Sequence, residues 1–180
     1  TSVFSGNKIN SLPILLKKYG YTSMFFHGGK NGTLNFDAYA KMAGFNYYYG
    51  KNEYNNDADY DGNWGIYDEE FLKFAVNTLD TSRQPFIAAL YTLSSHHPYS
   101  IPKKYRNKFK KGALEIHESI MYTDYSLKEF FKACSSQSWY DSTLFIITAD
   151  HSSLAGTPYY MNNAGSYAIP LIFYLPNSNL

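Results

Sequence analysis

The chain has 180 residues, 44% of them hydrophobic and 19% aromatic, and its 16 Lys and Arg residues nearly balance its 15 Asp and Glu residues. A net charge of +1 gives no overall electrostatic footprint for nucleic acid or an anionic membrane surface, with the basic cluster 103–111 as the one exception. No window approaches the roughly 18 apolar residues of a membrane span. The single cysteine, Cys134, excludes an internal disulfide and a multi-cysteine zinc site. The length suits one domain with a sizeable core.

Helix and strand signals alternate from the start of the chain. Ser11 as a cap, Pro13 in the first turn and Gly20 after the end predict a short helix over 11–20. The apolar run 22–26 predicts a strand that leads into a glycine-rich turn, HGGKNG.

A second helix and a long polar loop follow. Asn35 as a cap and Gly44 as a stop predict a helix over 35–44, and the Asn-, Asp- and Gly-rich segment 51–65 predicts a loop. Asp68 is then expected to cap a helix with an apolar face. The residues of this face are Phe71, Leu72, Ala75 and Leu79.

The second half of the chain repeats the alternation. Three apolar runs predict buried strands at 85–93, 143–149 and 169–175, and helical spacing predicts a helix over 113–135. The apolar positions of this helix are Ile116, Ile120, Leu127, Phe131 and Cys134, so we expect Cys134 to be a buried structural thiol. The basic cluster 103–111, KKYRNKFKK, is interpreted as a solvated loop, with a phosphate-steering or surface-binding patch as the alternative.

Continuous apolar strands that alternate with helices are normally covered on both faces. This pattern predicts an α/β layered sandwich with a largely parallel sheet flanked by helices. In such a fold, ligands collect beyond the carboxyl ends of the strands.

Metal-binding side chains follow three of the predicted strands. His27 comes after the first, His96 and His97 after the second, and Asp150 and His151 after the third. In a parallel sheet these loops share one edge, so the five side chains could meet in one crevice. Carboxylate oxygen and imidazole nitrogen suit Mn²⁺, Zn²⁺ or Mg²⁺, which would polarise a phosphoryl or sulfuryl oxygen.

Less specific interpretations exist for each of these residues. An isolated Asp150-His151 pair also fits a satisfied turn, and His27 fits a loop histidine packed on tyrosines. His97 fits a structural position, because Pro98 fixes the turn beside it. The placement of such residues after three separate strands is what favours a metal site.

A serine-hydrolase interpretation would pair Asp150 and a histidine with Ser94, Ser95 or Ser152. The sequence contains no G-x-S-x-G elbow, and none of these serines follows a strand with the expected glycines. This interpretation is therefore disfavoured.

Several spaced motifs occur in an order that resembles a known family. They are FFHGGKNG, YNNDADYDGNWGIYDEEFL, SSHHPY and YTDYSLKEFF, followed by WYDSTLFIITADH. The chain resembles the extracytoplasmic catalytic domain of the lipoteichoic acid synthase type, sulfatase-like phosphoglycerol transferases of the alkaline phosphatase superfamily. The similarity covers essentially all 180 residues.

The resemblance implies a metal-dependent, two-step transfer at phosphorus, in which a threonine beside a divalent cation attacks a phospholipid head group. Asp150 and His151 match the family's metal pair, and one Mn²⁺ ion is the expected cofactor, with Mg²⁺, Ca²⁺ or Zn²⁺ as alternatives. His96 matches the histidine of the S-N-H-x-P motif and is the expected catalytic general acid and a substrate contact. His27 matches the substrate-facing histidine of the HG motif.

The chain also departs from the family pattern. A Trp and an Arg that help to hold glycerol phosphate in the synthases are missing around Phe36, so phosphoethanolamine transfer, phosphodiester hydrolysis and sulfate ester hydrolysis stay open. Cys134 lacks the Cys/Ser-x-Pro-x-Arg context of a formylglycine site. Trp64 and Asp68 lie in a recurring family motif but are expected to serve packing and capping.

The resemblance further implies that residues 1–180 form a partial catalytic domain. The nucleophile and the other metal carboxylate of the family lie upstream of anything that matches Thr1, so we expect this chain to be inactive by itself. The implied partners are a phospholipid head group or a phosphorylated or sulfated glycan, not nucleic acid. The implied location is the extracytoplasmic side of a bacterial cell membrane, with the membrane region outside this chain.

Two rival interpretations belong to other classes. One is a non-catalytic envelope glycan-binding module whose abundant aromatic residues stack on sugars. The other is a degenerate structural paralogue whose site has decayed.

Overall fold

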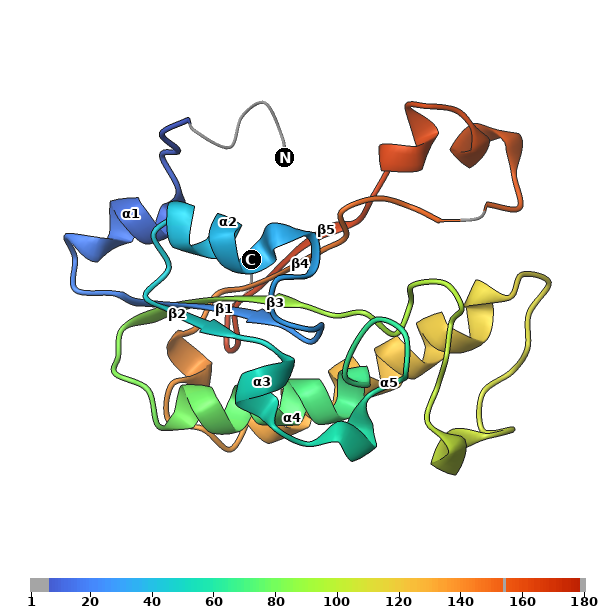
Figure 1. Cartoon of the computed structure of the whole chain (residues 1–180), viewed down its shortest axis with the longest axis horizontal. Helices are drawn as coiled ribbons and strands as arrows, with labels where there is room; N and C mark the ends of the chain where they lie inside the picture. The colour runs from blue at the N-terminus through green and yellow to red at the C-terminus, as the bar shows by residue number, and fades with distance from the viewer. Residues whose placement is uncertain (1–6, 154, 179–180) are drawn as a thin grey trace. The chain divides into compact units, whose positions relative to one another are not determined.

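The computed structural model describes residues 7–153 and 155–178, and the chain divides into two compact units, Thr1–Ser94 and Ser95–Leu180 (Figure 1). The domain predicted from sequence spans both units. Its residues 1–6, 154 and 179–180 lie outside the described residues. Among the described helices, none combines the length and apolar composition needed to cross a membrane.

The first unit is a parallel sheet, in the strand order β2-β1-β3, flanked by helices. Its strands are β1 (Thr22–His27), β2 (Tyr47–Tyr49) and β3 (Phe86–Tyr91). Its α-helices are α1 (Leu12–Lys17), α2 (Phe36–Met42), α3 (Lys51–Tyr54) and α4 (Asp68–Asp80), with 3₁₀ turns at Thr33–Asn35 and Asp57–Asp59. The predicted α/β class with parallel strands is confirmed.

The central strand β1 is covered on both faces because its side chains alternate between two helical layers. The ring of Phe25 lies 6.0 Å from the ring of Phe36, the first residue of α2. The ring of Phe26 lies 6.2 Å from that of Phe74 in α4. Figure 1 shows α2 and α4 on opposite sides of the strands. Coverage of both faces explains why the sequence of β1 is continuously apolar over Met24–Phe26.

Local signals set the ends of the first helix as predicted. The Ser11 hydroxyl accepts a hydrogen bond from the Ile14 amide at 3.3 Å, and Gly20 has a φ of 81°, which favours glycine. Asn35, the predicted cap of the next helix, instead has a φ of 60°, and its side chain makes no capping hydrogen bond. A cap needs extended backbone to aim its side chain at the first turn, and Asn35 is left-handed.

The second unit contains one long helix and a strand pair. These are α5 (Ile116–Cys134), β4 (Phe145–Thr148) and β5 (Leu171–Tyr174), with 3₁₀ turns at Lys103–Tyr105, Tyr140–Ser142, Pro158–Met161 and Gly165–Tyr167. The strands β4 and β5 pair antiparallel in a separate two-stranded sheet, so the prediction of two more strands in the parallel sheet is wrong for the described residues.

The prediction that β4 and β5 are buried also fails, because only one face of the pair is covered. Phe145 lies 5.1 Å from the ring of Phe131 in α5. On the other face, Ile146 is 52% exposed and its register partner Phe173 is 56% exposed. Apolar composition alone does not reveal which faces of a strand are covered.

The buried face of α5 agrees only in part with the predicted one, because Ile116 and Cys134 are buried and Ile120 is not. Ile120, a predicted core residue, is 48% exposed, whereas Tyr122 is fully buried. The residues of α5 that are buried are Ile116, Ser119, Tyr122, Ser126, Phe130 and Cys134. Cys134 is buried as predicted, and its burial raises the pKa of the thiol to about 12, which confirms a structural thiol.

Candidate functional site

The turn after β1 depends on a close approach of two backbone segments. The Gly28 carbonyl accepts a hydrogen bond from the Ile66 amide at 2.9 Å. A Cβ atom at Gly29 would lie 2.6 Å from Cε1 of His27 and 3.1 Å from the Trp64 carbonyl oxygen. Only glycine therefore lets the 60–66 loop lie against the turn that carries His27.

His27 itself is a buried aromatic-packed residue. Its side chain is 1% exposed, and its ring stacks on Phe36 at 4.4 Å. The Tyr48 hydroxyl lies 3.3 Å from Nδ1 of His27. Burial lowers the pKa of His27 to about 4, so the imidazole is neutral at neutral pH. This placement matches the interpretation of a histidine packed on aromatic rings, and the substrate contact stays a prediction.

The backbone that leaves β3 is held by Asp68. This residue is the first of α4, with Tyr67 in the cap position, so it is not the cap that the sequence predicted. Its carboxylate accepts hydrogen bonds from the amides of Leu93 at 3.0 Å and Ser94 at 2.9 Å. The Ser94 hydroxyl in turn accepts from the Asp68 amide at 3.0 Å. Asp68 therefore acts on the loop after β3 rather than on the helix end.

That loop continues into a tight turn that contains His96. The Tyr99 amide donates to the His96 carbonyl at 2.7 Å across a cis His97-Pro98 bond, which is the pattern of a type VI turn. Nδ1 of His96 lies 2.9 Å from the His97 carbonyl. A carbonyl can only accept, so Nδ1 of His96 is the donor in this contact. The role of His96 as a general acid stays a prediction.

The His96 turn contacts the segment that follows β4. The hydroxyls of Tyr99 and Ser153 lie 3.1 Å apart, within hydrogen-bond distance. This contact links the two loops of the second unit, while the convergence of His96 with Asp150 stays a prediction. Neither Tyr99 nor Ser153 is among the site residues predicted from the sequence.

Asp150 and His151 lie side by side directly after β4. Nε2 of His151 is 3.6 Å from Oδ2 of Asp150, and both side chains are about half exposed. Nδ1 of His151 lies 2.6 Å from the Ser152 carbonyl. A carbonyl can only accept, so the proton is on Nδ1 and the lone pair is on Nε2. This is the tautomer that metal-binding histidines adopt when a carbonyl accepts from the other nitrogen.

These two residues fit a divalent cation. Two ligands that each lie about 2.1 Å from one ion are ~3.4 Å apart at a tetrahedral angle, close to the separation of the Asp150 oxygen and the His151 nitrogen. The hydroxyl of Ser152 is buried and has no hydrogen-bond partner, so a polar atom beside the pair lacks a protein partner. Asp150, His151 and Ser152 thus have the chemistry of an incomplete ion site.

The predicted convergence of all five side chains is only partly visible. His27 belongs to the first unit, whereas His96, Asp150 and His151 belong to the second. The argument from a shared parallel edge holds for β1 and β3, because His27 pairs in register with Tyr91, but it fails for β4. Within residues 7–153 and 155–178, no group of three or more His, Cys, Asp or Glu side chains is placed to hold a metal.

The serines of the disfavoured hydrolase interpretation have other partners. The Ser94 hydroxyl bonds to the Asp68 amide, and the Ser95 hydroxyl lies 2.9 Å from that of Thr123.

Sequence reasoning missed Tyr48, Tyr99 and Ser153. Tyr48 lies in a run of three tyrosines, whose high β propensity was the available signal for β2. Tyr99 and Ser153 are far apart in sequence, so no local pattern could have linked them.

The first unit is an α/β sheet of parallel strands flanked by helices, and the second unit carries an Asp-His pair after β4. The sequence profile of the Sulfatase family matches residues 2–180, and the chain belongs to this family. The fold is that of the alkaline phosphatase superfamily, to which a matching solved structure belongs.

Two solved structures share the fold. A protein of the alkaline phosphatase superfamily from Vibrio parahaemolyticus superposes with a TM-score of 0.82 at 25% identity, over 98% of this chain and 44% of that one. The lipoteichoic acid synthase LtaP from Listeria monocytogenes superposes with a TM-score of 0.83 at 24% identity, over 98% of this chain and 48% of that one.

Two curated relatives are also named lipoteichoic acid synthases. Lipoteichoic acid synthase 1 of Bacillus subtilis is 29% identical over 156 residues, which cover 83% of this chain and 24% of that protein. Lipoteichoic acid synthase of Staphylococcus saprophyticus is 29% identical over 160 residues, which cover 86% of this chain and 25% of that protein. The chain therefore spans about a quarter of the length of these relatives.

Proposed function

We propose that this chain forms part of a metal-dependent phosphoryl-transfer site of the phosphoglycerol transferase kind. The observation that carries the proposal is the Asp150-His151 pair. Oδ2 of Asp150 lies 3.6 Å from Nε2 of His151, and Nδ1 of the same ring lies beside the Ser152 carbonyl. The similarity to lipoteichoic acid synthases supports the choice of phosphorus over sulfur chemistry.

Each site residue has a proposed role. Asp150 and His151 hold one divalent cation, with Mn²⁺ first and Mg²⁺, Ca²⁺ or Zn²⁺ as alternatives. When bound, the ion supplies positive charge for the phosphoryl oxygens. His96 in its doubly protonated form is proposed to donate the Nε2 proton to the leaving oxygen and to keep the Nδ1 proton, which the His97 carbonyl accepts. The nucleophile and further metal ligands are assigned to no residue of this chain.

The proposed donor is a glycerophosphate-containing lipid or a related phosphodiester. The names of the relatives support a lipid of the envelope, at the extracytoplasmic side of a bacterial membrane. His27 is proposed to contact the head group. His27 is 1% exposed, so this contact requires the surrounding rings to move.

A calorimetric Mn²⁺ titration tests the metal assignment. We expect the chain to bind Mn²⁺ and the Asp150→Ala variant to bind at least about tenfold more weakly, because loss of even an indirect metal-site partner costs that much. Asp80→Ala is the matched control, since it removes an equal charge from an exposed position at the end of α4. Equal affinity in the Asp150→Ala and Asp80→Ala variants would rule out Asp150 as a ligand.

A further inference from the structure

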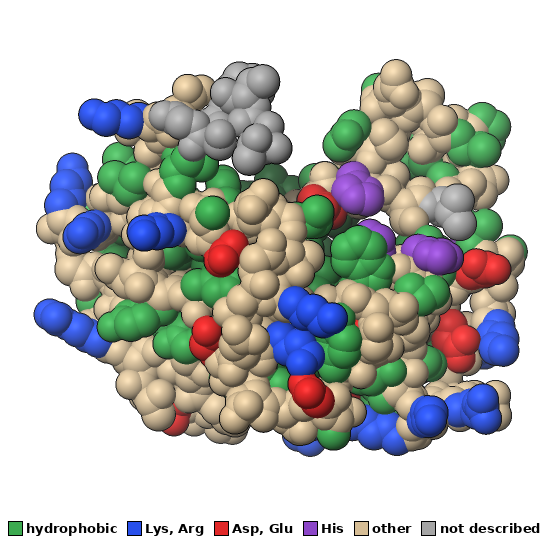
Figure 2. Space-filling view, viewed as in Figure 1, with side chains coloured by type: hydrophobic (Ala, Val, Ile, Leu, Met, Phe, Trp, Pro, Cys, Tyr) green, Lys and Arg blue, Asp and Glu red, His purple; other side chains and the backbone are tan. Residues whose placement is uncertain are grey.

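The segment 103–111, here called the basic segment, concentrates the positive charge of the second unit. Eight Lys and Arg residues occur in 95–180, and six of them lie in this segment. They are Lys103, Lys104, Arg106, Lys108, Lys110 and Lys111, and all are exposed. No Asp or Glu occurs between Asp80 and Glu115. Figure 2 shows Lys and Arg side chains at the lower right, in the area where Figure 1 draws this yellow-green segment.

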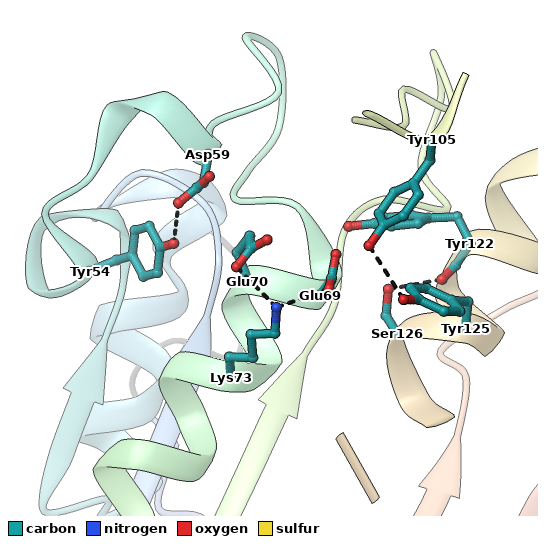
Figure 3. A network of polar contacts seen from close by, with 9 residues as sticks. All are labelled: Tyr54, Asp59, Glu69, Glu70, Lys73, Tyr105, Tyr122, Tyr125 and Ser126. Atoms are coloured by element: carbon teal, nitrogen blue, oxygen red, sulfur yellow. Dashed lines mark hydrogen bonds and ion pairs between the residues drawn. The ribbon is translucent and has the colours of Figure 1, made fainter. Parts of the chain in front are cut away.

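Aromatic packing holds the basic segment on α5. The ring of Tyr105 lies 5.3 Å from that of Tyr125 and 5.7 Å from that of Tyr122. The ring of Phe109 lies 5.9 Å from that of Tyr125. Figure 3 shows Tyr105 beside Tyr122 and Tyr125, with the hydroxyls of Tyr105 and Tyr125 hydrogen-bonded at 3.5 Å. The segment therefore has a fixed attachment, unlike the solvated loop that composition alone suggests.

One cation is part of this attachment. The ammonium nitrogen of Lys108 lies 3.5 Å from the ring centre of Tyr125 and 4.4 Å from that of Tyr105. Such cation–π contacts stabilise a partly exposed site by about 0.5–1 kcal/mol each. Because Lys108 packs against these rings, the backbone that carries the other cations of the segment is held on α5.

The charge of the basic segment acts locally although the chain is nearly neutral. Screening at physiological salt limits electrostatic interactions to about 8 Å, so a partner at this surface interacts chiefly with the basic segment and with the part of α5 on which it packs. Clusters of about four to eight Lys or Arg residues bind anionic lipid surfaces. The aromatic rings pack against α5, so binding would be electrostatic and would not require insertion.

We infer that the basic segment docks the chain on the surface of an anionic lipid bilayer. A linear polyanion is usually held in a positively charged groove that follows its backbone. These cations instead lie on an exposed loop and one 3₁₀ turn, Lys103–Tyr105, a form that suits a flat surface. The inference does not depend on the proposed metal chemistry, because adsorption requires no turnover.

Vesicle co-sedimentation of the purified chain tests this inference. We expect binding to phosphatidylcholine vesicles that contain phosphatidylglycerol, no binding to pure phosphatidylcholine, and loss of binding at high salt. The patch variant replaces Lys103, Arg106, Lys110 and Lys111 with Gln and should bind at least about tenfold more weakly. The charge-matched control replaces Lys8, Lys17, Lys18 and Lys41, all exposed in the first unit, with Gln.

The outcomes separate the inference from its rivals. Binding lost in the patch variant and kept in the control supports docking through the basic segment. Equal binding in the two variants, or no binding of the unmodified chain to anionic vesicles, overturns it. Binding to soluble polyphosphate without binding to anionic vesicles also overturns it, in favour of a polymer ligand. Thermal unfolding of both variants at the temperature of the unmodified chain confirms that the substitutions leave the fold intact.

Discussion

At the scale of single residues, the proton positions on the histidines are set by their neighbours. His96 and His151 each place Nδ1 within hydrogen-bond distance of a backbone carbonyl of the following residue. His27 differs, because its neighbours are aromatic rings and a tyrosine hydroxyl. The exposed His96 and His151 therefore share one kind of side-chain contact, and the buried His27 has another.

The buried His27 predicts a pH dependence of stability. Its folded pKa of about 4 lies below the unfolded value of 6.5, so the unfolded chain binds more protons between these pH values. The contribution of His27 is therefore complete above pH 6.5 and is lost as the pH falls toward 4. The loss can reach about 3 kcal/mol, and urea unfolding across this pH range measures it.

The His27→Gln variant is the control for this effect, because Gln does not titrate and can still bond to Tyr48. We expect the difference in unfolding free energy between the two proteins to shrink as the pH falls through this window. A constant difference across the window would show that His27 titrates as freely in the folded chain as in the unfolded one.

At the scale of elements, α5 shows how a helix can bury polar residues. The Ser119 hydroxyl donates to the Ile116 carbonyl at 2.9 Å, and the Ser126 hydroxyl donates to the Tyr122 carbonyl at 2.8 Å. Each hydroxyl is satisfied inside the helix, so its burial carries little penalty. Apolar periodicity does not reveal a buried face that contains serines, so it predicted Ile120 on the buried face instead.

Two alanine variants of α5 distinguish these faces. Tyr122→Ala should cost about 3–5 kcal/mol of unfolding free energy, because it empties a fully buried position. Ile120→Ala should cost less than about 1 kcal/mol, because Ile120 is 48% exposed. Chemical denaturation of both variants measures the costs, and a larger loss for Ile120→Ala would restore the face predicted from sequence.

At the scale of the whole molecule, the accuracy of the sequence-based predictions follows the range of the interactions. The ends of α1 were predictable because Ser11 and Gly20 act locally. The parallel sheet of the first unit was predictable because β1 is apolar on both faces. The antiparallel pairing of β4 with β5 was not, because an apolar run carries no information about strand direction.

The candidate site shows the same division. His27, His96, Asp150 and His151 were identified because each follows a predicted strand. The Tyr99–Ser153 contact and the anchoring of Leu93 and Ser94 by Asp68 were not foreseeable, because they link residues 54, 25 and 26 positions apart. Candidate reactive residues can therefore be predicted from sequence more readily than the residues that position them.

The exposed face of the β4–β5 pair predicts self-association. Ile146 and Phe173 are register partners, and both are more than half exposed on a two-stranded sheet. Exposed apolar strand faces of this kind promote association. We expect the mass of the purified chain, measured by light scattering after size exclusion, to rise with concentration.

An opposite-charge pair across these strands should abolish this association. Ile146→Lys with Phe173→Glu places opposite charges directly across the strands, which preserves the pairing. The control is Leu12→Lys with Leu15→Glu on one face of α1, where the two side chains are 58% and 49% exposed. A monomer at every concentration, or equal association of both variants, would contradict the prediction.

The central position of β1 has a consequence for synthesis on the ribosome. Thr22 pairs with Phe86 in the finished sheet, so β1 leaves the exit tunnel well before its partner β3 has been translated. At about 5–20 residues per second, the delay is on the order of several seconds. The apolar segment Met24–Phe26 is meanwhile unpaired on that edge, so this part of the sheet can form only after β3 has been made.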